Sequence, residues 1–256
     1  MHVPPALGFE RDGNVAIVRL ERTAKRNALD DETVRGLETL FRDLPGDVRA
    51  VVLCARGEHF SAGLDLSALT ATTPLESLAR SQMWYRAFEL IQYGNVPVVA
   101  ALHGAVIGGG LELAAAAHIR VADATAYYAL PEAQRGIFVG GGGSVRISRI
   151  IGVARMMDLM LTGRIYTAEE GQQFGISQYL VAAGAAEARA LELAKQMTTV
   201  PPLSVYGILH AIPRNAEADP ATGYVLENLM AAMAAADPVA QERIAAFLAG
   251  RAAKVK

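Results

Sequence analysis

Hydrophobic residues in the first half of the chain fall into short runs separated by amphipathic stretches. Runs rich in β-branched or small apolar residues predict strands at residues 15–20, 49–54 and 96–102. Between them, an amphipathic stretch through Phe41 and a longer one over residues 75–93 predict helices. Strands that alternate with helices are typical of βα crossovers, so we expect a largely parallel sheet.

Start signals support both helices. Asp30 or Asp31 stands where a side chain can cap the first helix, because a carboxylate accepts hydrogen bonds from the free N–H groups of a first turn. Thr73-Pro74 precedes the second, and proline is favoured at a first helical position.

The second half changes character. Short strands are expected at residues 119–122 and 126–130, and from Gly152 onward the pattern is helical. The last helical segment contains Asp237-Pro238, where a helix should stop and restart. The predicted helices cover residues 152–162, 167–174, 184–199, 201–214 and 221–248. An α/β core followed by a helical region, packed on that core, is the expected organisation.

Composition excludes several classes of protein. The chain of 256 residues is 52% hydrophobic, with a formal net charge of −2 and no basic run before its last six residues, so we expect no nucleic-acid partner. Cys54 is the single cysteine and lies in an apolar run, which predicts an inert buried thiol. No apolar run reaches the ~18 residues of a membrane span, and no signal peptide is recognisable. We expect a cytoplasmic protein that does not bind membranes.

A triple glycine, Gly108-Gly109-Gly110, is the most informative motif. It follows a strand-like run and opens a helix that carries Glu112. The first N–H groups of a helix lack intrahelical acceptors, so they suit a negative charge. The G-x-G-x-x-G spacing of dinucleotide sites is absent. Glu112 is either a proton carrier beside this anion site or an exposed acid favoured by the helix dipole.

Two other segments have equally ordinary alternatives. Residues 60–66 read as a strand-to-helix turn, in which Gly63 allows a positive φ and Asp65 acts as a cap. Glu132 can be a solvated carboxylate, and residues 140–143, four consecutive glycines, a flexible loop. The five histidines form no H-x-x-x-H pattern, so no metal is expected.

Taken together and in this order, these segments resemble the enoyl-CoA hydratase/isomerase, or crotonase, superfamily. The matching landmarks are Lys25-Arg26-Asn27-Ala28-Leu29, residues 60–66, residues 97–104, residues 108–114, Pro131-Glu132 and Leu161-Thr162-Gly163-Arg164. The resemblance implies an α/β spiral of repeated ββα units over residues 1–195. It also implies a C-terminal helical trimerisation region over residues 196–256, in a homotrimer or dimer of trimers.

The resemblance further implies an acyl-CoA thioester substrate, with no cofactor beyond the coenzyme A that the substrate carries. The N–H groups of Leu64 and Gly109 match the family's oxyanion hole, and Glu112 and Glu132 match its two catalytic acids. Residues that match the substrate-binding segments are Lys25, Arg26, Ala28, Ala62, Gly63, Asp65, Ser67 and Gly108. Two acids favour hydration of an enoyl-CoA, as in fatty acid β-oxidation. Isomerisation, hydratase-lyase cleavage of a phenylpropenoyl thioester and non-catalytic acyl-CoA binding remain alternatives.

Ser67 departs from the family pattern, because many hydratases carry a basic residue at this position. Neutralisation of the coenzyme A phosphates is therefore expected from Lys25 and Arg26, or from Arg251 or Lys254 of a neighbouring subunit.

The acyl pocket is expected to differ from that of many relatives. Val139 stands where they carry proline, in a loop near the acyl site. Trp84 and Tyr85 lie on the helix that often lines this pocket, where they either favour a bulky acyl group or belong to the core.

Overall fold

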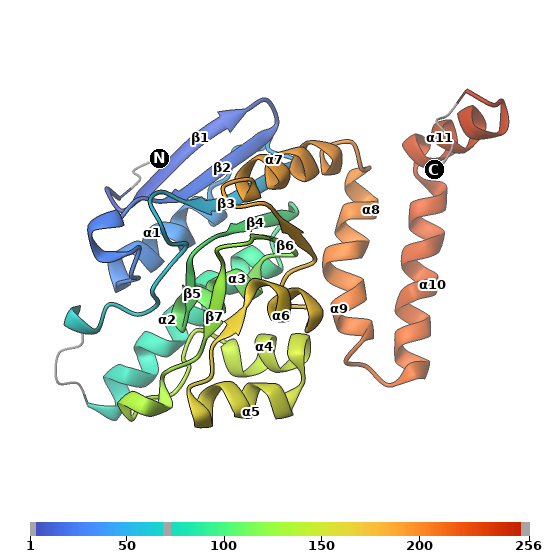
Figure 1. The fold of residues 1–256 in the computed structure, drawn as a ribbon. Helices are drawn as coiled ribbons and strands as arrows, with labels where there is room; N and C mark the ends of the chain where they lie inside the picture. The colour runs from blue at the N-terminus through green and yellow to red at the C-terminus, as the bar shows by residue number, and fades with distance from the viewer. Residues whose placement is uncertain (1–3, 69–72, 252–256) are drawn as a thin grey trace. The chain divides into compact units, whose positions relative to one another are not determined.

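The computed structural model describes residues 4–68 and 73–251 (Figure 1). It divides into two compact units, residues 1–198 and 199–256. This division lies three residues beyond the boundary expected from the sequence, after residue 195. Lys254 lies outside the described residues.

A six-stranded sheet forms the centre of the first unit. Its strands lie in the order β1-β2-β3-β4-β6-β9. Only β1 and β2 pair antiparallel, so the expectation of a largely parallel sheet is confirmed. The bounds are β1 Leu7–Asp12, β2 Val15–Leu20, β3 Ala50–Ala55, β4 Val98–Leu102, β6 Ile119–Asp123 and β9 Tyr179–Val181. The sequence pattern did not predict β1 and β9.

A second sheet lies beside the first and carries β5 (Ala105–Ile107), β7 (Tyr127–Ala129) and β8 (Tyr166–Thr167). Ser61, which follows β3, bridges Val106 of β5, and Val106 pairs with Tyr128 of β7. Three successive chain turns therefore repeat one arrangement. In each turn, a strand of the large sheet is followed by a short extended segment in the small sheet and then by a helix.

Most helices of the first unit begin where the sequence supplies a side-chain cap or a glycine; the helix that follows Ala185 does not. Asp30 accepts a hydrogen bond from the Thr33 amide, and Thr73 forms a capping box with Glu76. The helices are α1 Asp31–Arg42, α2 Pro74–Gln92, α3 Gly109–Ala116, α4 Gly143–Ile151, α5 Val153–Thr162, α6 Ala168–Gln173 and α7 Ala186–Met197. Only α4 was missed, because its first turn is hidden in the glycine run.

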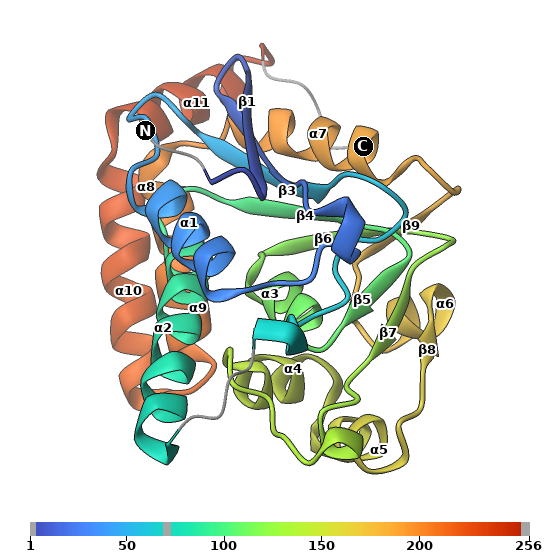
Figure 2. The ribbon, with the colours of Figure 1, turned by 90° about the vertical axis from the view of Figure 1, so that its left-hand side faces the viewer.

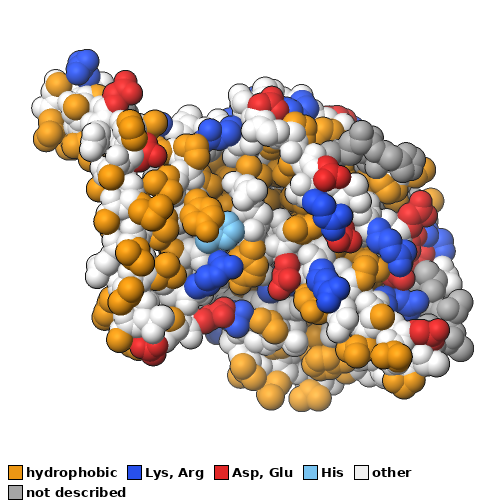
Figure 3. Space-filling view, turned by 180° about the vertical axis from the view of Figure 1, so that it is seen from behind, with side chains coloured by type: hydrophobic (Ala, Val, Ile, Leu, Met, Phe, Trp, Pro, Cys, Tyr) orange, Lys and Arg blue, Asp and Glu red, His pale blue; other side chains and the backbone are white. Residues whose placement is uncertain are grey.

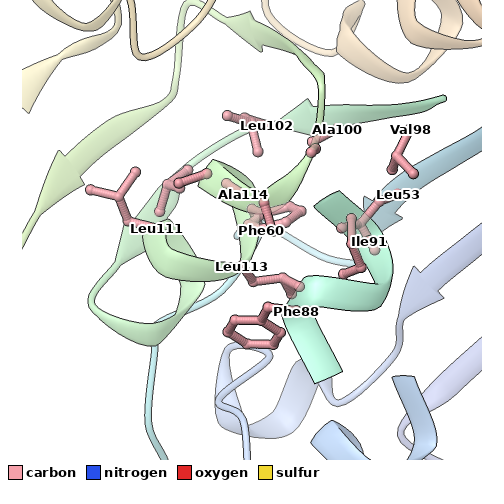
Figure 4. Packing of buried hydrophobic residues seen from close by; sticks show 14 of the residues in the cluster. Leu53, Phe60, Phe88, Ile91, Val98, Ala100, Leu102, Leu111, Leu113 and Ala114 are labelled. Carbon is pink, nitrogen blue, oxygen red and sulfur yellow. The ribbon is translucent and has the colours of Figure 1, made fainter. Parts of the chain in front are cut away.

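Helices cover both faces of the large sheet, with α7 on one face and α1, α2 and α3 on the other (Figure 2). Alternate residues of the strands face these two layers. Val18 and Leu53 pack with α1, α2 and α3, whereas Ile17 and Val52 pack with α7. Figure 4 shows the first of these layers, with side chains from β3, β4, α2 and α3. Cys54 is buried in the second layer, and burial raises the pKa of its thiol to about 12, as expected of an inert cysteine.

The second unit is helical. Its elements are α8 Pro202–Tyr206, the π-helical segment η4 Gly207–Ala211, α9 Ile212–Asn215, α10 Pro220–Ala236 and α11 Pro238–Leu248. The break at Asp237 is confirmed, because its side chain caps α11 by accepting from the Val239 amide. Figure 3 shows hydrophobic side chains gathered over these helices; the exposed ones include Tyr224, Val225, Leu229, Met233, Ile244 and Phe247. No helix within the described residues has the length and apolarity to cross a membrane.

Candidate active site

The small sheet brings three loops together. Ser61, Val106 and Tyr128 lie abreast on neighbouring chain segments. Leu64 and Gly109 each follow their strand residue by three positions, and Glu132 follows Tyr128 by four. A cavity of about 480 Å³ lies where these loops meet, lined among others by Ala62, Leu64, Leu66, Arg80, Ser81, Trp84, Gly108, Gly109, Glu112, Pro131, Glu132, Ile137, Phe138 and Gly141.

Two backbone amides form one wall of this cavity. A Cβ at Gly63, whose φ is +88°, would lie 2.6 Å from the Ile107 carbonyl oxygen and 3.2 Å from the Gly109 nitrogen. A Cβ at Gly109 would lie 3.5 Å from the Leu64 nitrogen. The two loops therefore touch through glycines, and this contact brings the Leu64 and Gly109 nitrogens close together. Within residues 4–68 and 73–251, neither N–H donates a hydrogen bond. Paired free donors suit an oxyanion.

Glu112 is buried, with only 3% of its surface exposed. The interpretation as an exposed first-turn acid is therefore wrong. Its Oε1 accepts hydrogen bonds from the amides of Gly141 and Gly143, each at 2.8 Å. Burial raises the pKa of Glu112, while these amides and the positive charge of Arg146 oppose that rise.

The glycine run is a cradle for this carboxylate. A Cβ at Gly143 would lie 2.8 Å from Glu112 Oε1, and one at Gly141 would lie 2.9 Å from the Phe88 ring. Gly142 has a φ of +95°. The interpretation of residues 140–143 as a flexible loop is wrong, because close approach and a positive φ require glycine here.

Glu132 is also buried, at 8% exposed, so it is not a solvated carboxylate. Its Oε2 is buried without a hydrogen-bond partner among the described residues. Burial, and then the nearby charge of Glu112, raise the pKa of Glu132 to about 7. The two acids therefore differ: Glu112 accepts hydrogen bonds from two amides, whereas Oε2 of Glu132 has no donor in the part of the chain that the structure describes.

The expected substrate-binding residues divide into two groups. Ala62 and Gly108 line the cavity with Leu64 and Gly109. The other expected residues lie in two adjoining loops, residues 22–28 and residues 61–67, and do not line the cavity. They are Lys25, Arg26, Ala28, Gly63, Asp65 and Ser67.

Hydrogen bonds and an ion pair join these two loops. The Ala62 amide donates to the Arg26 carbonyl at 2.9 Å, and Lys25 Nζ donates to Ser67 Oγ at 3.2 Å. Asp65 accepts from the Ser67 hydroxyl at 2.6 Å and forms an ion pair with Arg22 at 2.7 Å. The Ser67 hydroxyl and Arg22 lower the pKa of Asp65. Asp65 therefore stabilises the loops, and coenzyme A contacts by this group stay predictions.

One face of α2 supplies wall residues that sequence reasoning left open or missed. Trp84 lines the cavity, packs against Gly109 and donates from Nε1 to Asp31 at 3.0 Å. Trp84 therefore belongs to the buried core and also lines this cavity, whereas Tyr85 lines a separate cavity. A preference for a bulky acyl group stays a prediction. Arg80 and Ser81 were missed, although their helical spacing from Trp84 places all three on one face.

Comparisons with known proteins agree with this geometry. The sequence model of the family described as "Enoyl-CoA hydratase/isomerase" matches residues 10–255. An enoyl-CoA hydratase of Mycobacterium tuberculosis is 36% identical over 214 residues, which cover 82% of this chain and 80% of the relative. A 2,3-dehydroadipyl-CoA hydratase of Escherichia coli is 30% identical over 94% of each chain. The crystal structure of a putative enoyl-CoA hydratase from Rhodopseudomonas palustris is 54% identical, with a TM-score of 0.95 and full coverage of both chains.

Proposed function

Because this chain belongs to the enoyl-CoA hydratase/isomerase family, we propose that it is an enoyl-CoA hydratase that adds water syn across the double bond of a 2-trans-enoyl-CoA. The product is a 3-hydroxyacyl-CoA. The observation that carries the proposal is one cavity that holds two free amides and two carboxylates of unequal surroundings.

The amides of Leu64 and Gly109 bind the thioester oxygen. As water attacks the β-carbon of the acyl group, the electrons of the double bond move toward this oxygen and form an enolate. Preorganised donors bind the developing charge more strongly than the ground state, and one such donor contributes about 3 kcal/mol to the transition state.

Glu112 and Glu132 divide the proton transfers. Glu112 is the base, since two amides solvate its ionised form. It takes one proton from water while the oxygen of that water bonds to the β-carbon. Glu132 is the acid, because its buried Oε2 lacks a donor that would stabilise an ionised carboxylate. It gives its proton to the α-carbon as the enolate collapses. The reaction is redox-neutral, and the coenzyme A of the substrate is the only cofactor it involves.

We further propose that the protein is a homotrimer or a dimer of trimers and that its substrates are coenzyme A thioesters. Exposed apolar side chains on α10 and α11 support association of subunits through this region. Lys25 and Arg26 are exposed beside the cavity loops, which supports a role in neutralising the coenzyme A phosphates. Arg251 belongs to the second unit.

Turnover assays separate this proposal from its alternatives. The wild type is incubated with crotonyl-CoA, a cinnamoyl-type CoA thioester and a 3-enoyl-CoA, and products are identified by mass spectrometry. We expect loss of enoyl absorbance and a product heavier by one water. A shifted double bond without added water identifies an isomerase, and an aldehyde product identifies a hydratase-lyase. Thioester binding without any turnover identifies a binding protein.

A further inference from the structure

Arg146 is a buried arginine that contacts the glycine cradle of residues 140–143 and takes no part in the proposed proton transfers. Arg146 lies in the first turn of α4 and is 6% exposed. It lines a second cavity of about 400 Å³ rather than the active-site cavity. Arginine is rarely buried to this extent unless it is paired, so its contacts require an explanation.

Those contacts lead to Glu112. Arg146 Nη1 donates to the Gly141 carbonyl oxygen at 2.8 Å, and Nε donates to Gln92 Oε1 at 2.6 Å. The Gly141 amide donates in turn to Glu112 Oε1 at 2.8 Å. Gly141 is thus bound at its carbonyl by the arginine and at its amide by the acid.

We propose that Arg146 is a positioning residue for hydration: it holds Gly141, and thereby the amides that solvate Glu112, in place. The inference rests on the proposed function, because it names what keeps the proposed base aligned. No proton passes through the arginine.

A run of four glycines requires such an anchor, since glycine has the largest backbone freedom to lose. Ser81 holds the preceding peptide, donating from Oγ to the Gly140 carbonyl at 2.7 Å. Arg146 holds the next one. A Cβ at Gly142 would collide with Arg146 Nη1, so the loop also closes tightly over the guanidinium.

The charge of the guanidinium acts in the same direction as its hydrogen bonds. Among the described residues, the charged and titratable groups that face Arg146 are Glu89 and Tyr93 from α2 and its C-cap, Glu112 from α3 and Arg149 from α4. Arg146 is the cation whose charge opposes the rise in the pKa of Glu112, whereas Glu132, the acid beside it, holds its proton in the proposed mechanism. Removing Arg146 therefore removes a positive charge that favours the ionised form of Glu112.

The test compares Arg146→Gln with Arg149→Gln and Arg146→Lys in the full chain. Arg149→Gln makes the same charge change on the same helix and is the control for the loss of a positive charge near Arg146. Displacing a reacting group by an ångström costs about 100-fold, so we expect kcat of Arg146→Gln to fall about 10- to 100-fold, with KM nearly unchanged. The acid limb of its kcat/KM profile should move to higher pH, since a base without its cation holds its proton more tightly. Arg146→Lys should recover most of kcat, and Arg149→Gln should match the wild type.

Hydrogen exchange of the peptide spanning residues 139–145 provides a readout independent of turnover. We expect faster exchange in Arg146→Gln than in Arg149→Gln. Unchanged exchange together with an unshifted acid limb would overturn the proposal, even if kcat falls through reduced folding. If the wild type hydrates no enoyl-CoA, the proposed function fails, and the exchange comparison still decides whether Arg146 holds the cradle.

Discussion

The carboxylate of Glu132 occupies the space into which a side chain at Gly108 would point. A Cβ at Gly108 would lie 2.6 Å from Glu132 Oε1, and the φ of Gly108 is +53°. The glycine that precedes α3 therefore has two reasons to be glycine: a backbone conformation that other residues rarely adopt, and an acid packed against it.

Gly108→Ala should therefore affect both the stability of the fold and the rate of the reaction, and a control variant can tell the two effects apart. We expect it to destabilise the fold by about 1–3 kcal/mol through its positive φ and to lower kcat about 100-fold by displacing Glu132. Gly136→Ala is the matched control, because Gly136 has a φ of +71° and nothing within 4 Å of the added Cβ. It should lose similar stability and keep kcat. Equal kcat in the two variants would show that Glu132 does not need the space at Gly108.

Glutamine substitutions test the two-acid mechanism. Glu112→Gln and Glu132→Gln should each lower kcat by about 100-fold or more, since each removes one proton transfer. Binding of the 3-hydroxyacyl-CoA product, followed by calorimetry, should change little because neither acid holds the thioester. Glu169→Gln, an exposed acid on α6, is the control. An active Glu112→Gln beside an inactive Glu132→Gln would favour the isomerase alternative.

The raised pKa of Glu132 predicts how stability depends on pH. The folded state holds this proton up to about pH 7, whereas the unfolded chain loses it near the ordinary glutamate value of about 4.5. The stabilising contribution is therefore complete below that value and is lost as pH rises through 7; over this range it amounts to about 3 kcal/mol. Urea unfolding should show Glu132→Gln gaining stability relative to the wild type between pH 4.5 and pH 8. If the difference in free energy of unfolding between the two proteins does not change with pH, the pKa of Glu132 is not raised in the folded protein.

Gly109 allows a direct test of the oxyanion hole. It is the first residue of α3, a position at which proline suits the helical φ but removes the N–H. Gly109→Ala keeps the N–H and brings the same Cβ against Trp84, 2.9 Å away. We expect Gly109→Pro to be about 100-fold slower than Gly109→Ala, because one oxyanion donor is worth about that factor. Similar rates for the two variants would mean that the Gly109 amide does not bind the thioester oxygen.

The sequence predicted the parts of this protein that local pattern controls. Runs of β-branched residues marked β2, β3 and β4 to within two residues, and Thr73-Pro74 marked the start of α2. These elements can be predicted because they depend only on the spacing of apolar residues and on capping residues next to each helix.

Other features depend on contacts between distant segments. The burial of Glu112 and Glu132 depends on how three chain turns stack, which a local sequence pattern does not report. The start of α4 was hidden because its glycines are fixed by Glu112 and Arg146 rather than by their own propensity. Arg80 and Ser81 could have been predicted, because they lie four and three residues before Trp84 and so share its face of the helix.

In the proposed mechanism, this cavity adds water to an enoyl thioester with two acids and two amides. The most direct test of this mechanism is incubation of the wild type with crotonyl-CoA in isotopically labelled water that carries heavy oxygen and deuterium. We predict a 3-hydroxybutyryl-CoA with heavy oxygen on the β-carbon and one deuterium on the α-carbon, formed by the wild type and not by Glu112→Gln or Glu132→Gln. Crotonyl-CoA that binds but acquires no heavy oxygen would contradict the account.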